Sequence, residues 1–201
     1  MQRAVLTGDI VGSTGLSETE LADVFRMIEA TAREIAVWQQ ASTRLTRSRG
    51  DGWQLMLTEP RLALRAALAV MAGVQALGTA TRVAAATGTG RPGDAATLEA
   101  ASGAAFIASG RALDTMDPNV RLASPDGGAV SALFRLADAL ASDWTQAQSR
   151  AVALKLPPAP PTNAQIGTTL GISRQAVEKA LAGAKFGAIE DALTLIEAAY
   201  D

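Results

Sequence analysis

The 201-residue chain contains no cysteine and no histidine. The absence of cysteine excludes disulfides, thiolate metal sites and cysteine nucleophiles. The absence of histidine removes the commonest general base, the Ser-His-Asp triad and every zinc site that needs imidazole. Any chemistry must therefore rest on carboxylates, arginines, backbone amides or recruited metal ions.

The chain also lacks a strong net charge and a long apolar run. Its formal charge is −2, which is too balanced to indicate a nucleic-acid or membrane partner. No apolar run approaches the roughly 20 residues of a membrane span, and residues 1–6 lack the apolar core of a signal peptide. The sequence predicts a soluble cytoplasmic protein of one domain, or of one domain with a small appendage.

Apolar periodicity and turn residues divide the first 126 residues into strands and helices. Ser17 and Glu20 form a capping box before the first helix, and the Asp51-Gly52 step indicates a hairpin between two strands. The expected strands are 3–6, 42–49, 53–57, 82–87 and 120–122, and the expected helices are 17–38, 60–78 and 102–113. The first six elements follow the ferredoxin-like order β-α-β-β-α-β, with the helices expected on one face of an antiparallel-containing sheet.

Residues 127–201 show helical patterns only. The expected elements are one long helix with Leu133, Leu136, Leu140, Trp144 and Ala151 on one face, a stiff proline-rich linker at 157–161, and short helices at 163–170, 173–184 and 186–199. The fold class is therefore predicted as α+β, a ferredoxin-like sheet domain followed by an all-α helix-turn-helix domain. The predicted boundaries are 1–126 for the sheet domain, 127–161 for a bridging helix and linker, and 162–201 for the helix-turn-helix domain.

Two aspartates and a glycine-containing turn fall at neighbouring strand ends. Asp9 leaves the end of the first strand, and Asp51 stands at the tip of the hairpin expected beside it. Two carboxylates a few ångströms apart repel each other, and a divalent cation offsets that repulsion. Residues 12–14 open a helix, so their amide groups point at any anion that lies there. These residues predict a metal-nucleotide site; the alternative is that Asp9 caps a turn and Asp51 begins an ordinary hairpin.

The same segments resemble class III nucleotidyl cyclases over residues 1–115. The family motif Asp-Ile-x-Gly-Phe/Ser-Thr is matched by residues 9–14, and the Gly-Asp-Gly hairpin by residues 50–52. The Arg-x-Gly-Ile-His-x-Gly strand is matched more loosely by residues 82–88, and the Gly-x-x-Val-Asn-x-Ala-x-Arg motif by residues 103–111. The resemblance implies a cyclase- or palm-like form of the predicted sheet domain.

The resemblance also implies roles for individual residues. Asp9 and Asp51 would hold two divalent ions, Mg²⁺ or Mn²⁺, with the Ile10 carbonyl as a further ligand. Arg111, the implied catalytic residue, would reach across a homodimer to contact phosphate in the transition state. The implied contacts to a nucleoside triphosphate are Ile10, Val11, Gly12, Ser13, Thr14 and Arg47, of which Gly12, Ser13 and Thr14 act through backbone amides.

Three positions depart from the cyclase pattern. Ile107 stands where cyclases place an asparagine that orients the ribose, and Arg47 stands at the base-selecting lysine position. Ala100 occupies the acidic base-selecting position, with Glu99 one residue out of register. Loss of substrate orientation alone can forfeit several kcal/mol of barrier reduction, so such a site would bind a nucleotide and turn it over slowly or not at all.

A second motif lies at residues 163–177, which resemble a helix-turn-helix of the sigma-region-four or MarR kind. Gly171 permits the tight turn and Ser173 caps the second helix. The expected small core is Ile166, Leu170, Ile172, Val177 and Leu181. The residues expected to face the major groove are Ser173, Arg174, Gln175, Glu178 and Lys179, with Lys155 and Lys185 near enough for phosphates.

The alternative for this motif is a helical hairpin used for dimerisation or for docking on another protein. Residues 127–201 contain six basic and seven acidic side chains. A module of near-zero charge binds the phosphate backbone weakly unless its charges cluster or it dimerises.

Over nearly the whole length the chain resembles SatD-like bacterial proteins, which pair a cyclase-like first half with a helix-turn-helix. Three hypotheses follow. The first is a regulator whose first domain binds a metal-nucleotide and whose second domain reads DNA or a partner. The second is an active nucleotidyl cyclase or related nucleotidyl-transfer enzyme. The third is a purely structural DNA-binding or scaffolding dimer with a relict first domain. The presence of both Asp9 and Asp51 disfavours the last, and Ile107 and Ala100 disfavour the enzyme.

Overall fold

A five-stranded sheet forms the centre of the first half of the protein. In this computed structural model, residues 1–48, 50–93, 98 and 100–200 are described. The strands are β1 (Gln2–Val11), β2 (Arg44–Arg47), β3 (Trp53–Leu57), β4 (Ala80–Thr89) and β5 (Leu122–Ala123), in the sheet order β2-β3-β1-β4-β5. The central strand β1 pairs antiparallel with β3 and β4, and β5 joins β4 in parallel. The predicted β-α-β-β-α-β order of the first six elements is confirmed.

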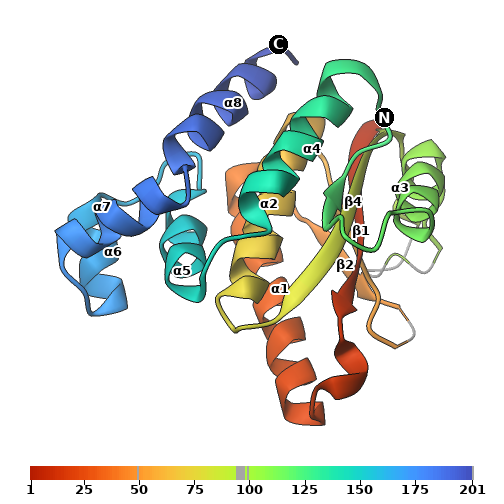
Figure 1. The fold of residues 1–201 in the computed structure, drawn as a ribbon. Coiled ribbons are helices and arrows are strands. Elements are labelled where there is room, and N and C mark those ends of the chain that lie inside the picture. The colour runs from red at the N-terminus through yellow and green to blue at the C-terminus, as the bar shows by residue number, and fades with distance from the viewer. Residues whose placement is uncertain (49, 94–97, 99, 201) are drawn as a thin grey trace.

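Helices lie on both faces of this sheet. α1 (Glu18–Trp38) and α2 (Ala63–Gln75) cover one face, and α3 (Ala104–Asp114) lies on the other, where it contacts β1 and β4 (Figure 1). The two helices of the first six elements thus share one face as expected, whereas the expectation does not hold for the later helix α3. The reason is a second, small apolar cluster on the face that α3 covers, formed by Val5, Met56, Leu98 and Ala105.

The predicted capping box starts α1 as expected. The Ser17 hydroxyl accepts a hydrogen bond from the Glu20 amide (3.2 Å), and the Glu20 carboxylate accepts one from the Ser17 amide (2.8 Å). Two orphan amides of the helix start are thereby satisfied. A short 3-10 turn, η1 (Ser13–Gly15), precedes this cap and connects it to β1. A second 3-10 turn, η2 (Pro60–Leu62), leads into α2.

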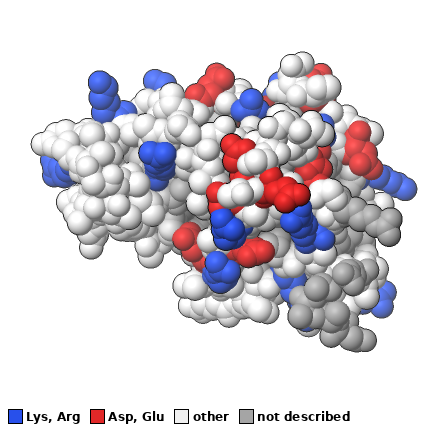
Figure 2. Space-filling model, turned by 90° about the horizontal axis from the view of Figure 1, so that it is seen from below, with Lys and Arg blue, Asp and Glu red and all other residues white. Residues whose placement is uncertain are grey.

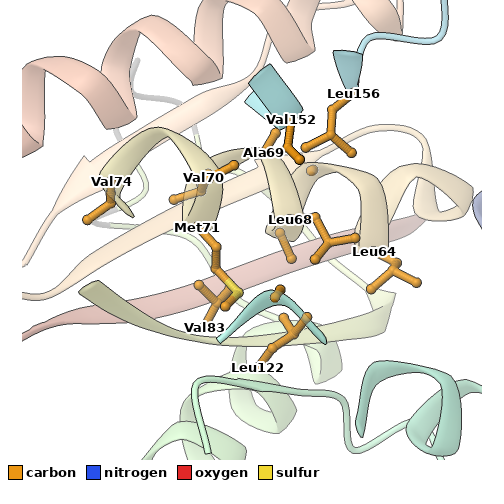
Figure 3. Close-up of a cluster of buried hydrophobic side chains, with 14 of the residues drawn as sticks. Leu64, Leu68, Ala69, Val70, Met71, Val74, Val83, Leu122, Val152 and Leu156 are labelled. Carbon is orange, nitrogen blue, oxygen red and sulfur yellow. The ribbon is translucent and has the colours of Figure 1, made fainter. Parts of the chain in front are cut away.

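The buried helix α2 joins the sheet to the C-terminal helices. Every residue from Ala63 to Gln75 is buried. Figure 3 shows Met71 pointing towards Val83 and Leu122 of the sheet, while Val152 and Leu156 approach the same helix from its other side. One continuous hydrophobic core therefore extends from the sheet into the second half of the chain.

The second half contains α4 (Gly128–Ala141), α5 (Gln146–Lys155), α6 (Asn163–Leu170), α7 (Arg174–Gly183) and α8 (Phe186–Ala198). The prediction of a single long helix from Leu133 to Ala151 is wrong, because the helix ends at Ala141 and a new one begins at Gln146. Thr145 accepts a hydrogen bond from the Gln148 amide (3.3 Å), and the Gln148 side chain accepts one from the Thr145 amide (2.8 Å). This second capping box begins a new helix in place of continuing the old one.

α6 and α7 are joined by the three-residue turn 171–173. Gly171 ends α6 with φ 68°, a left-handed conformation that glycine adopts readily. Ser173 caps α7 by accepting a hydrogen bond from the Ala176 amide (3.1 Å). Of the residues expected in the core of this pair, Ile166 and Val177 are fully buried, but Ile172 is 43% exposed. The expectation for Ile172 is wrong because it lies in the turn itself. Leu181 is buried and Leu170 is partly buried against the core.

Within the part of the chain that the structure describes, no helix has both the length and the apolar character needed to cross a lipid bilayer.

Candidate functional site

An open cleft lies where β1 ends and η1 begins. It has a volume of about 400 Å³ and is lined by Asp9, Ile10, Val11, Gly12, Ser13, Thr14, Asp51, Arg82 and Pro118. Seven of these nine residues are the ones expected from the sequence at the metal and phosphate positions, and the structure brings them together on one surface. Figure 2 looks onto this end of the molecule and shows acidic and basic side chains interleaved near the centre of the view.

Asp51 is fixed by the turn that follows β1. The Ser13 hydroxyl donates a hydrogen bond to Asp51 Oδ2 (2.5 Å). The hairpin is closed on its other side by a hydrogen bond from the Ser48 amide to the Gly52 carbonyl (2.9 Å). These contacts hold a carboxylate at the tip of the β2–β3 hairpin against the start of η1.

The amides of residues 12–14 lie at the beginning of this turn. Gly12 has φ 68°, and the first hydrogen bond of the turn runs from the Gly15 amide to the Gly12 carbonyl (2.9 Å). The first amides of a helical turn precede its internal hydrogen bonds and are therefore available to an anion. The turn thus places potential phosphate donors beside Asp51.

Asp9 is held by an arginine from the neighbouring strand. Asp9 of β1 stands directly opposite Arg82 of β4 in the antiparallel register. Arg82 Nε donates to Asp9 Oδ1 (2.9 Å), and Arg82 Nη2 pairs with Asp9 Oδ2, so the ion pair is bidentate. The hydrogen bonds to Asp9 raise the pKa of the Arg82 guanidinium above its ordinary value, and the Asp51 charge adds to the effect.

A buried tryptophan holds the Asp9 backbone in place through a threonine hydroxyl. Trp53 Nε1 donates to the Thr81 hydroxyl (3.2 Å), which in turn donates to the Asp9 carbonyl (2.6 Å). Trp53 is fully buried. The end of β1 is therefore fixed in position by the core, and a carboxylate carried on a rigid strand is well placed to bind a ligand.

The donor atoms of the cleft are of the type that Mg²⁺ and Mn²⁺ prefer, because carboxylate and carbonyl oxygens are hard ligands. Asp9, Asp51 and Ile10, which carry such oxygens, all line the cleft. Among residues 1–48, 50–93, 98 and 100–200, no three acidic, histidine or cysteine side chains gather into a metal-binding group. The oxygen donors of Asp9, Asp51 and Ile10 fit ions that also take ligands from a bound phosphate, as Mg²⁺ usually does.

Two solved structures similar to this chain are nucleotidyl cyclases. A bacterial light-regulated adenylyl cyclase matches with a TM-score of 0.45 and 17% sequence identity, over 61% of this chain and 74% of that chain. The guanylyl cyclase Cya2 matches with a TM-score of 0.42 and 15% identity, over 60% of this chain and 73% of that one. No protein-family model and no curated protein matches the sequence.

Sequence reasoning missed Arg82 and Pro118 as residues of the cleft. Arg82 opens the loosely matched motif at residues 82–88 and a strand that is otherwise apolar from Val83 to Ala86, but the sequence assigned it no role in the cleft. A charged residue at the start of such a strand indicates that it pairs with another polar group, but which group depends on the register between β1 and β4. Pro118 comes from the loop between α3 and β5, which no motif marks.

Arg47 lies on a different surface from the other predicted nucleotide-binding residues. Its guanidinium stacks over the Phe25 ring of α1, 3.9 Å from the ring centroid, and lines a separate cavity of about 340 Å³. Arg47 pairs with Trp53 in the sheet, and Trp53 pairs with Gly8. Residues that pair directly across strands lie on the same face of the sheet, so Arg47 shares the face of Gly8. Successive residues of a strand face opposite sides, so Asp9 belongs to the other face.

Arg111 and Ile107 lie one helical turn apart on α3, and both side chains are exposed. α3 is held to the sheet by its other side, where the hydroxyls of Ser109 and Thr7 lie 2.8 Å apart in a hydrogen bond. Arg111 does not line the cleft of its own chain. Ala100, at the acidic base-selecting position, is exposed, and Glu99 lies outside the described residues.

The residues expected to contact DNA form an exposed surface at the start of α7. Ser173, Arg174, Gln175 and Lys179 are all exposed. Arg174 Nε forms an ion pair with Glu178 Oε1 at 3.2 Å. Lys155 Nζ donates to the Pro161 carbonyl (3.4 Å). On the face that Figure 2 shows, basic side chains towards the left stand apart from one another and form no continuous patch.

Proposed function

We propose that the chain is a regulator in which the cleft beside β1 binds a nucleoside triphosphate with Mg²⁺ or Mn²⁺ and the α6–α7 pair binds DNA. One observation carries the nucleotide-binding proposal. Asp9, Asp51 and the amide-bearing turn 12–14 line a single open cleft, so acidic ligands for a cation and donors for a phosphate stand side by side. The cleft volume of about 400 Å³ lies in the usual range for small-molecule sites.

Each part of the ligand has a counterpart in the cleft. The amides of Gly12, Ser13 and Thr14 would donate to phosphate oxygens. Asp9, Asp51 and the Ile10 carbonyl would hold two divalent ions. Such ions neutralise phosphate charge and, where chemistry follows, activate the attacking oxygen and stabilise the leaving one.

Asp51→Ala is expected to weaken Mn²⁺-dependent nucleotide binding by roughly a hundredfold or more, because even outer-shell partners of metal ligands contribute about tenfold to a hundredfold. Calorimetric titration of the purified protein with Mn²⁺ and each of the four nucleoside triphosphates measures the affinity. The matched control is Asp191→Ala, which removes an exposed carboxylate from α8 and should leave the affinity unchanged. Equal affinities of the wild type and Asp51→Ala would end the metal-site proposal.

A second candidate function is nucleotidyl transfer, as a cyclase or a related enzyme. Arg111 is exposed on α3 and does not line its own cleft, which leaves this guanidinium available to the cleft of a second copy in a homodimer. The same titration mixtures, followed by chromatography, separate the two functions. Binding without product supports the regulator. A cyclic or linked nucleotide that is absent with Asp51→Ala or Arg111→Ala would instead establish the enzyme.

The DNA-binding part of the proposal rests on the exposed start of α7. Arg174→Ala is expected to lower affinity for a duplex selected by this protein from a random-sequence pool by about tenfold to a hundredfold, since one good base contact contributes about 1–3 kcal/mol. Arg26→Ala, which removes an exposed arginine from α1, is the matched control and should bind that duplex as the wild type does.

Gel-shift titration at fixed salt measures both variants, because salt alone changes such affinities strongly. Failure of the wild type to enrich any duplex would exclude DNA as the partner of α7. An enriched duplex that Arg174→Ala binds normally would move the contact surface away from the start of this helix.

A further inference from the structure

Arg82 is the one cation among the described residues that line the cleft, and it lies in contact with a carboxylate proposed to hold a metal. Its side chain is 29% exposed and that of Asp9 is 22% exposed, so neither group is locked in the interior. Both oxygens of Asp9 are engaged by the guanidinium. The arginine therefore occupies the position on Asp9 that a divalent ion would take.

The same guanidinium can serve a second ligand. The planar fork of arginine matches a phosphate as well as it matches a carboxylate, in both cases through two parallel hydrogen bonds. Arg82 faces the space that Ser13, Thr14 and Asp51 also line. A phosphate bound at the turn would thus offer the guanidinium an alternative partner within the same cleft.

We propose that Arg82 is an internal counter-cation of the cleft, which holds Asp9 while no metal is bound and transfers to the phosphates of the nucleotide when a divalent ion takes Asp9. This inference rests on the proposed nucleotide site and adds its regulation. In the absence of nucleotide, a divalent ion must displace the guanidinium and leave it without a partner. With nucleotide present, the displaced guanidinium gains the phosphate.

Metal and nucleotide are therefore coupled through one side chain. Each ligand raises the affinity of the other, and the coupling is reciprocal because it is a difference in binding free energies. The protein would stay nearly metal-free until the metal-nucleotide complex arrives. Asp51, which is held by the neutral Ser13 hydroxyl, has no such internal competitor among the described residues that line the cleft.

The test is Mn²⁺ binding in the absence of nucleotide, measured by electron paramagnetic resonance of the free ion. Arg82→Gln, which keeps much of the side-chain volume without the charge, is expected to bind Mn²⁺ roughly tenfold to a hundredfold more tightly than the wild type. The factor by which a non-hydrolysable nucleoside triphosphate raises Mn²⁺ affinity should fall by a similar amount. Arg150→Ala, which removes an exposed arginine of α5, is the charge-matched control and should behave as the wild type.

A second variant distinguishes loss of the charge from loss of structure at β4. Arg82→Lys retains the charge but cannot form the bidentate pair, so its Mn²⁺ affinity should fall between those of the wild type and Arg82→Gln. Circular dichroism and the melting temperature establish that each variant is folded before titration.

The outcomes separate this inference from the proposed function. Mn²⁺ affinities that are equal in the wild type, Arg82→Gln and Arg82→Lys, together with normal nucleotide binding, would overturn the role of Arg82 and leave the nucleotide site standing. Absence of both Mn²⁺ and nucleotide binding in the wild type and in Arg82→Gln would overturn the proposed site, and the role of Arg82 with it.

Discussion

Glu197→Ala is expected to lower the free energy of unfolding by about 3–5 kcal/mol, because it removes one partner of a buried ion pair and leaves the other charge uncompensated. Arg65 of α2 donates to both carboxylate oxygens of Glu197 of α8, at 2.6 and 3.1 Å. Its third donor reaches the Leu156 carbonyl at the end of α5 (2.7 Å). The side chains of Arg65 and Glu197 are only 7% and 12% exposed, so water cannot replace the lost carboxylate.

Urea unfolding measures this loss, and the same helix supplies the control. Glu190→Ala removes an exposed carboxylate from α8 and should change stability by no more than about 0.5 kcal/mol. The double variant Arg65→Met with Glu197→Leu should recover much of the loss, since apolar replacement of a whole buried pair is often neutral or stabilising. A Glu197→Ala protein as stable as Glu190→Ala would contradict the buried pair.

Local signals in the sequence predicted the local parts of this structure. The capping box of Ser17 and Glu20, the hairpin around Asp51, and the left-handed turn at Gly171 with its Ser173 cap each depend on residues a few positions apart. Because the turn after β1 and the hairpin tip could both be placed from such signals, the acidic and amide-bearing parts of the cleft could be predicted as well.

Long-range pairing explains what could not be predicted. The contact between Asp9 and Arg82 joins positions 73 residues apart, and nothing local specifies which residue of β4 stands opposite Asp9. A shift of one residue in that register would turn Arg82 to the other face of the sheet. The position of Arg47 over Phe25 has the same origin, because strand alternation assigns it to the face opposite Asp9.

Competing local signals explain the error in the second half. Apolar spacing from Leu133 to Ala151 continues through residues 142–145 and indicates one helix, whereas Thr145 and Gln148 provide a start signal for another. The structure follows the start signal, and the Trp144 indole then donates to the Ala184 carbonyl (3.0 Å). This bond attaches the segment between α4 and α5 to the end of α7, a contact that helical periodicity alone does not reveal.

Gly8→Ala is expected to destabilise the protein by about 1–3 kcal/mol or more through overpacking, and to disturb the cleft as well. A methyl group at Gly8 would lie 2.4 Å from Trp53 Cζ2 and 2.5 Å from the Arg82 carbonyl oxygen. Neither neighbour can move cheaply. Trp53 is fully buried and its indole is hydrogen-bonded to Thr81, and the Arg82 carbonyl belongs to β4 beside the central strand.

The matched control for this substitution is Gly15→Ala, because an added methyl group there meets no atom within 4 Å. Gly15→Ala should change the free energy of unfolding by no more than about 0.5 kcal/mol, whereas Gly8→Ala should shift the urea midpoint clearly downwards. Since Asp9 follows Gly8 directly on β1, the displaced backbone should also separate Asp9 from Asp51 and weaken Mn²⁺-dependent nucleotide binding in the protein that remains folded. Equal stability of the two alanine variants would show that β1 and β4 can move apart at Gly8 without loss, which would contradict the tight support of the cleft by Trp53.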